Sequence, residues 1–142
     1  MIGALLYFSK DQEVTLAGAG AVASEEVKKA SDIEELGRGH QKFIEIWSDG
    51  NFADEDYVLD IVLLVGATSP GTVSLMEVAH GIDGDGATGI GLKMSAGVGF
   101  MVAKVPLPSL NLDDFISLSY VSTAAITAGG HLTAFINPEM MG

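Results

Sequence analysis

Apolar and polar residues alternate along several short stretches of the chain, which is the pattern of strands that bury one face. In residues 41–47, for example, Ile44 and Ile46 fall on one face of the expected strand and Trp47 falls on the other. Similar alternation marks residues 57–65, 116–121 and 132–136, with shorter candidates at 14–16, 73–77, 92–94 and 100–105. Many short strands in succession predict an all-β sandwich or barrel.

Turn-forming residues separate these runs at intervals of roughly ten residues. The separating segments are 48–51 (SDGN), 69–71 (SPG), 83–86 (DGDG) and 128–130 (AGG). Gly, Asp, Asn, Ser and Pro each favour a reversal of the chain. Pro106 and Pro108 lack the amide hydrogen that a strand ladder needs, so we expect the strand at 100–105 to end there or to lie at a sheet edge.

One segment, residues 24–35, fits a helix as well as a strand. Ser24 is a good N-cap residue, and acidic residues follow it in the first turn. Val27, Ala30 and Ile33 recur at every third position, as on one face of a helix. A helix of about three turns is marginal unless it packs against the core. The residues alone therefore leave helix and extended chain as equal alternatives.

Length and composition limit the chain to one domain and exclude several classes of protein. Residues 1–142 are the length of a single domain. With no cysteine, there is no disulfide framework and no thiolate metal cluster. Nineteen acidic residues against seven basic ones give a net charge of −12, and residues 1–60 carry −8 of it. We expect no nucleic-acid partner, because phosphate contacts depend on Lys and Arg.

We also expect neither a membrane segment nor an export signal. The apolar residues 1–8 have no positive charge before them and are followed closely by Lys10 and Asp11. The longest interior apolar run, residues 61–67, is much shorter than the roughly 20 residues of a membrane-spanning helix.

No motif in the sequence predicts a catalytic, cofactor-binding or metal-binding residue. His40, His80 and His131 are far apart, and no spacing pairs two imidazoles on one helix or hairpin. Residues 83–86 begin like a calcium loop, but the twelfth position, which requires Glu, is Met94. An alternative function, a small-ligand or calcium-binding β-sandwich module, depends on this segment and on the acidic first sixty residues.

Aromatic and apolar residues provide a candidate surface for a protein partner. The strand at 41–47 has large apolar side chains on both faces, so both faces should meet something apolar. A core covered by its own loops and an exposed patch that binds a partner both explain this pattern. The candidate interface residues are Ile2, Leu5, Phe8, Trp47, Phe52 and Tyr120, with residues 1–12 as an N-terminal contact segment.

Three stretches of the chain are similar in order and spacing to the small cement (decoration) proteins of tailed-bacteriophage capsids. Residues 1–15 (MIGALLYFSKDQEVT) resemble the start of that family, and residues 32–39 (DIEELGRG) resemble a longer form of its Asp-Ile-Gly-x-Gly loop. Residues 115–120 (FISLSY) and 126–136 (ITAGGHLTAFI) resemble its closing strand pair and Thr-Ala-Gly turn. Residues 66–104 depart most, with Gly, Ala and Met where the family has Thr, Ser and Asp.

The resemblance implies a jelly-roll-type antiparallel β-sandwich of about eight short strands with little helix, and extended chain at residues 24–30. It also implies a structural virion protein without enzyme activity or cofactor, made in the host cytoplasm and placed on the outer capsid surface. Its expected partners are the phage major capsid protein and a second copy of itself in a dimer, with no nucleic acid and no membrane. The net charge of −12 is consistent with this expected role, since it keeps the free protein in solution and away from packaged DNA.

Overall fold

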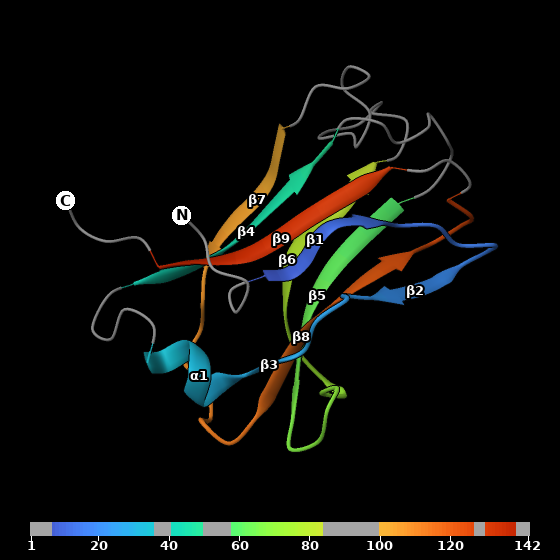
Figure 1. Ribbon diagram of the computed structural model, residues 1–142. Helices are drawn as coiled ribbons and strands as arrows, with labels where there is room; N and C mark the ends of the chain where they lie inside the picture. The colour runs from blue at the N-terminus through green and yellow to red at the C-terminus, as the bar shows by residue number, and fades with distance from the viewer. Residues whose placement is uncertain (1–6, 36–40, 50–57, 84–99, 127–129, 139–142) are drawn as a thin grey trace.

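The computed structural model describes residues 7–35, 41–49, 58–83, 100–126 and 130–138, and these form nine strands and one short helix (Figure 1). In chain order the elements are β1 (Tyr7–Glu13), β2 (Gly20–Ala23), β3 (Lys28–Lys29), α1 (Ala30–Glu35), β4 (Lys42–Ser48), β5 (Val58–Gly66), β6 (Val73–Asp83), β7 (Phe100–Pro106), β8 (Phe115–Ser122) and β9 (His131–Pro138).

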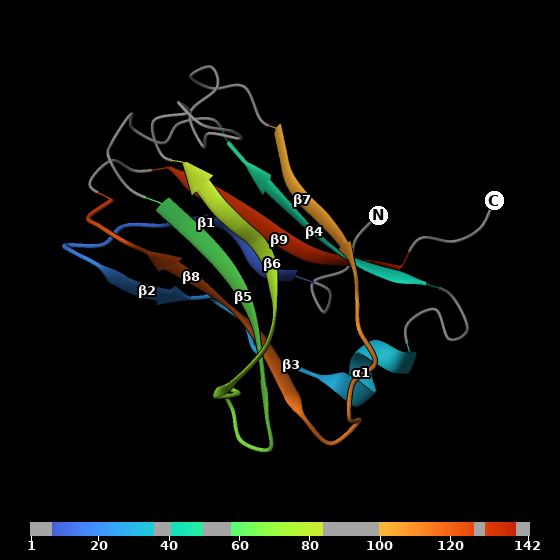
Figure 2. The same cartoon turned by 180° about the vertical axis from the view of Figure 1, so that it is seen from behind.

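The strands form two sheets that pack face to face. One sheet has the order β1-β9-β4-β7, and the other has the order β2-β8-β5-β6, with β3 also paired to β8. Every strand pair is antiparallel. In Figure 1 the β1-β9-β4-β7 sheet lies towards the viewer. Figure 2 is turned by 180°, so that the β2-β8-β5-β6 sheet lies towards the viewer.

The pairing of strands is nested from the ends of the chain inwards. The first strand, β1, pairs with the last, β9; β2 pairs with β8, β4 with β7, and β5 with β6. A long hairpin with the β5–β6 turn at its tip has thus been rolled into two sheets, which is the topology of a jelly roll. The predicted all-β jelly-roll sandwich is confirmed.

The core lies between the two sheets and consists of the residues that the alternation assigns to one face. The fully buried side chains include Ile44, Ile46, Leu59, Ile61, Leu63, Ile116, Leu118, Leu132 and Ile136. Period-2 alternation works well here because each antiparallel sheet buries only one of its faces.

One expected strand is misplaced, and one alternative is resolved. The strand expected at residues 14–16 does not form there, because β1 ends at Glu13 and Leu16 makes only an isolated bridge to Ile126. In the ambiguous segment, Lys28–Lys29 pairs with β8 and the helix is confined to Ala30–Glu35, so residues 24–29 are not helical and only Lys28–Lys29 form a strand. Ala30 and Ile33 are buried, so the apolar spacing marks the packed side of a helix that starts later than Ser24.

The turn between β5 and β6 brings two backbone segments into close contact at Gly71. A Cβ atom at this position would overlap the backbone of Val65 and Gly66, which cannot rotate away as a flexible side chain would. We expect Gly71→Ala to lower the free energy of unfolding by about 1–3 kcal/mol in a urea titration. Gly18→Ala is the matched control, because an added Cβ there meets no heavy atom within 4 Å. An equal effect of both substitutions would contradict the expectation.

Candidate functional site

The six predicted interface residues fall into three groups. Phe8 and Tyr120 are both 0% exposed and belong to the core, so their assignment to a partner surface is wrong. They lie on inward-facing positions, where their bulk fills the space between the sheets. Trp47 is 39% exposed and is accessible to a partner. Ile2, Leu5 and Phe52 lie outside the described residues, as does the first half (residues 1–6) of the N-terminal contact segment.

The hydroxyl group of Tyr120 is buried but has a partner. Tyr120 Oη lies 2.7 Å from Ser9 Oγ, so β8 of one sheet is joined to β1 of the other. Ser9 Oγ also donates to Gln12 Oε1, and Gln12 Nε2 donates to the backbone carbonyl of Ala23 at 2.9 Å. Burial raises the pKa of the Tyr120 phenol well above its ordinary value, a shift that the Ser9 hydrogen bond partly opposes.

The outer face of the β1-β9-β4-β7 sheet carries aromatic side chains, although an outer sheet face is usually polar. Tyr7 and Phe135 lie opposite each other in register, with ring centroids 5.7 Å apart. Phe43 and Trp47 lie on the same outer side of β4, two positions either side of Glu45. We call Tyr7, Phe43, Trp47 and Phe135 the aromatic face. Lysine side chains partly cover this face, with Lys104 Nζ 5.0 Å from the centroid of the Phe43 ring.

Glu45 holds the indole of Trp47 in place. Its carboxylate accepts a hydrogen bond from Trp47 Nε1 at 3.0 Å and another from Asn137 Nδ2 at 2.8 Å. Glu45 itself is 8% exposed, so its carboxylate is largely shielded from water. Met101, which is 45% exposed, lies opposite Trp47 in register on β7. Trp47 and Met101 therefore form an exposed apolar pair at the β7 edge of the aromatic face.

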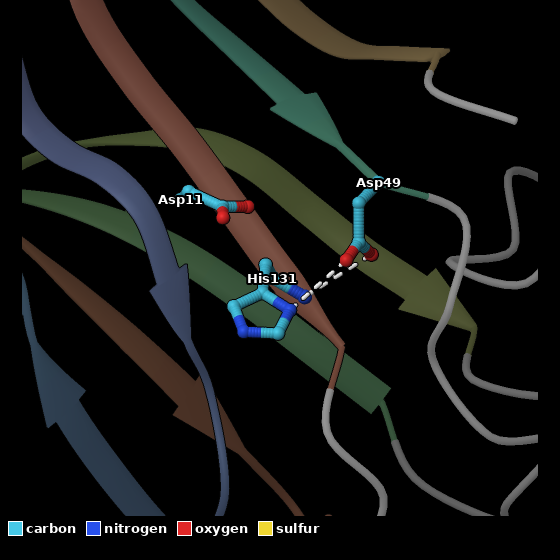
Figure 3. A group of neighbouring side chains, drawn as sticks. All are labelled: Asp11, Asp49 and His131. Carbon is cyan, nitrogen blue, oxygen red and sulfur yellow. Dashed lines mark hydrogen bonds and ion pairs between the residues drawn. The ribbon is translucent and has the colours of Figure 1, made fainter. Parts of the chain in front are cut away.

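A separate cluster of Asp11, Asp49 and His131 lies at one end of the same sheet (Figure 3). One ligand atom from each residue can be chosen so that all three lie within 4.8 Å of one another. His131 Nδ1 lies 3.0 Å from Asp49 Oδ2, and the imidazole is about one-third exposed. The arrangement presents one nitrogen and two carboxylates to a common space and can hold a cation.

Three neighbouring strands position this cluster. Asp49 directly follows β4, and His131 is the first residue of β9. Two hydrogen bonds of 3.1 Å join them: Asp49 N donates to His131 O, and His131 N donates to Asp49 Oδ1. Asp11 lies in an irregularity of the β1–β9 ladder between Ser9 and Gln12, with φ of 52°. Asp tolerates this left-handed conformation better than most residues, and such bulges redirect side chains.

The sequence did not reveal this cluster. Asp49 stood in a predicted turn and His131 at a strand edge, while Asp11 was one acidic residue among many. Their proximity depends on β9 lying between β1 and β4, which no local pattern predicts. Glu13 also approaches the group, with Oε2 at 4.0 Å from His131 Nε2. Of the calcium-like segment 83–86, residues 84–86 lie outside the described residues, and His40 lies outside them as well.

No protein-family model matches the sequence, and no curated protein matches it. Among the described residues, no helix is long and apolar enough to cross a membrane.

Proposed function

We propose that this chain is a structural virion protein that binds the outer surface of a tailed-bacteriophage capsid and stabilises it by bridging neighbouring major capsid subunits. Its role is that of a cement or decoration protein, with no enzyme activity, made in the host cytoplasm and carried on the virion. It acts as a homo-oligomer, a dimer by the resemblance of its sequence.

The fold supports this proposal together with the sequence resemblance. The cement-like segments at residues 115–120 and 126–136 correspond to β8 and to the start of β9, which are central strands of the two sheets. Jelly rolls are frequent in viral capsid proteins, although lectins and enzymes also use them. Among these functions the sequence resemblance favours a capsid protein, and the fold is compatible with that function.

The observation that carries the proposal is the exposed Trp47–Met101 pair at the edge of the aromatic face, in which Phe135 is itself buried. Trp is among the residues that contribute most to protein interfaces, and large exposed apolar groups on a sheet face mark binding surfaces. The hydrogen bond from Trp47 to Glu45 fixes the indole before binding, which reduces the entropy lost when a partner is bound. Many copies on a capsid lattice allow each single contact to be modest.

The proposal is tested by adding the purified protein to capsids that lack it, assembled from the major capsid protein encoded in the same genome. We expect co-sedimentation with the capsids and a higher temperature of capsid disassembly. Trp47→Ala should weaken binding at least about 30-fold, the effect of losing an interface residue worth about 2 kcal/mol. The fold should be retained, because Trp47 is partly exposed.

Leu112→Ala is the matched control, because Leu112 is 49% exposed but lies in the connection before β8 and not on a strand of the β1-β9-β4-β7 sheet. Equal loss of binding in both variants would place the interface elsewhere. Absence of binding by the unmodified chain, with no change in capsid disassembly, would reject the function. A rise in thermal midpoint on adding calcium would instead favour the ligand-binding module.

A further inference from the structure

We propose that Asp11, Asp49 and His131 form a binding site for one divalent transition-metal ion of the zinc class. The inference does not depend on the proposed capsid function, because it rests on side chains at the end of one sheet. The candidate ligands come from β1, from the residue after β4 and from the start of β9, so one ion would join three strands (Figure 3).

The spacing of the donor atoms suits a single ion. Ligand atoms bound tetrahedrally at about 2.0–2.2 Å from zinc are roughly 3.3–3.6 Å apart. The three donors already lie within 4.8 Å of one another, and His131 Nδ1 and Asp49 Oδ2 are 3.0 Å apart. Small side-chain rotations, mainly of the exposed Asp11, would close the group around an ion.

The donor set favours a transition metal over calcium. Imidazole nitrogen is a good ligand for zinc and its neighbours in the first transition row, whereas calcium requires six to eight oxygen ligands. Three protein ligands leave a fourth position for water, as in zinc sites that remain open to solvent. The exposure of Asp11 and the partial exposure of Asp49 and His131 give the ion a route to the site.

Two features hold the ligands in place before an ion arrives. Asp49 and His131 are fixed to each other through their backbones at the end of the β4–β9 ladder, and the Asp11 amide donates to Thr133 Oγ1 at 3.0 Å. On the far side of the imidazole, Glu13 Oε2 lies 4.0 Å from His131 Nε2. This distance is too long for a hydrogen bond, but a small rotation of the exposed Glu13 side chain would allow one, and a carboxylate hydrogen-bonded behind a metal-bound histidine orients the ring.

The site is tested by calorimetric titration of the full-length, tag-free chain with zinc chloride after treatment with EDTA and dialysis. We expect saturable binding of one zinc ion per chain. With free zinc at 100 times the dissociation constant, the thermal midpoint should rise by about 8 °C. Calcium chloride at the same concentration should leave the midpoint unchanged.

Asp11→Asn and His131→Gln should each weaken zinc binding at least about 10-fold. Asp113→Asn should not, since Asp113 lies in the connection before β8, at the other end of the sandwich. Because Asp11 is exposed, its variant should retain the fold, and far-ultraviolet circular dichroism checks both variants. Absence of saturable zinc binding, or binding that neither substitution weakens, would overturn the site. An equal rise of the midpoint with calcium would overturn its selectivity.

Discussion

Replacing Tyr120 with alanine is expected to lower the free energy of unfolding by about 3–5 kcal/mol, the range measured when large aromatic core residues are truncated. Tyr120 is 0% exposed and among the largest fully buried side chains in the described part of the chain. Its ring fills space between the sheets, and its hydroxyl joins β8 to Ser9 on β1. Urea unfolding followed by the fluorescence of Trp47 measures the loss.

Tyr120→Phe separates the two contributions of this side chain. The phenylalanine variant keeps the ring and removes the hydrogen bond to Ser9, so its cost should be only about 1 kcal/mol. A cost below about 1 kcal/mol for Tyr120→Ala, combined with a loss of association, would return Tyr120 to the surface role that its sequence position suggested.

Alkaline pH is expected to destabilise the protein through the same residue. Burial, the largest cause, raises the pKa of Tyr120 above the ordinary tyrosine value of 10.0. The hydroxyl is neutral in both states below that pH, so the full stability is present there. As the pH rises further, the unfolded chain releases a proton that the folded chain retains. The free energy of unfolding should therefore begin to fall near pH 10 and approach a slope of about 1.4 kcal/mol per pH unit above it.

The measurement is a series of urea titrations from pH 8 to pH 12, in which Tyr120→Phe serves as the control. All other ionisable groups remain in both proteins, so their contributions cancel in the difference. The difference between wild type and variant should be constant up to about pH 10, then shrink and change sign as the wild type loses stability faster. A constant difference up to pH 12 would show that the phenol ionises freely in the folded protein.

Local patterns predicted the strands better than they predicted function. Alternation located β4, β5, β8 and β9 because each buries one face, so inward residues such as Ile44 and Ile61 recur at every second position. It placed the first strand too late, because the bulge at Asp11 interrupts the alternation in β1. The helix starts only at Ala30, since Lys28 and Lys29 pair with β8, a contact with residues far along the chain.

The candidate sites depended on which strands are neighbours, and this information is not local. Phe8 and Tyr120 are apolar or aromatic like true interface residues, and only the packing of the two sheets shows that they are internal. The outer position of Trp47 followed directly from its alternation with Ile46. By contrast, Asp11 and His131 are separated by most of the chain and meet only because β1 pairs with β9.

The nested order of strand pairs also has a consequence for biosynthesis. The partner of β1 in its sheet is β9, and β4 also needs β9 on one side, so neither is fully paired until residues 131–138 have left the ribosome. The hairpin of β5 and β6 can form much earlier, because its strands are adjacent in the chain. Contacts between distant residues slow folding. We therefore expect the chain to fold after synthesis is nearly complete, and truncation before β9 to yield a species that chaperones retain.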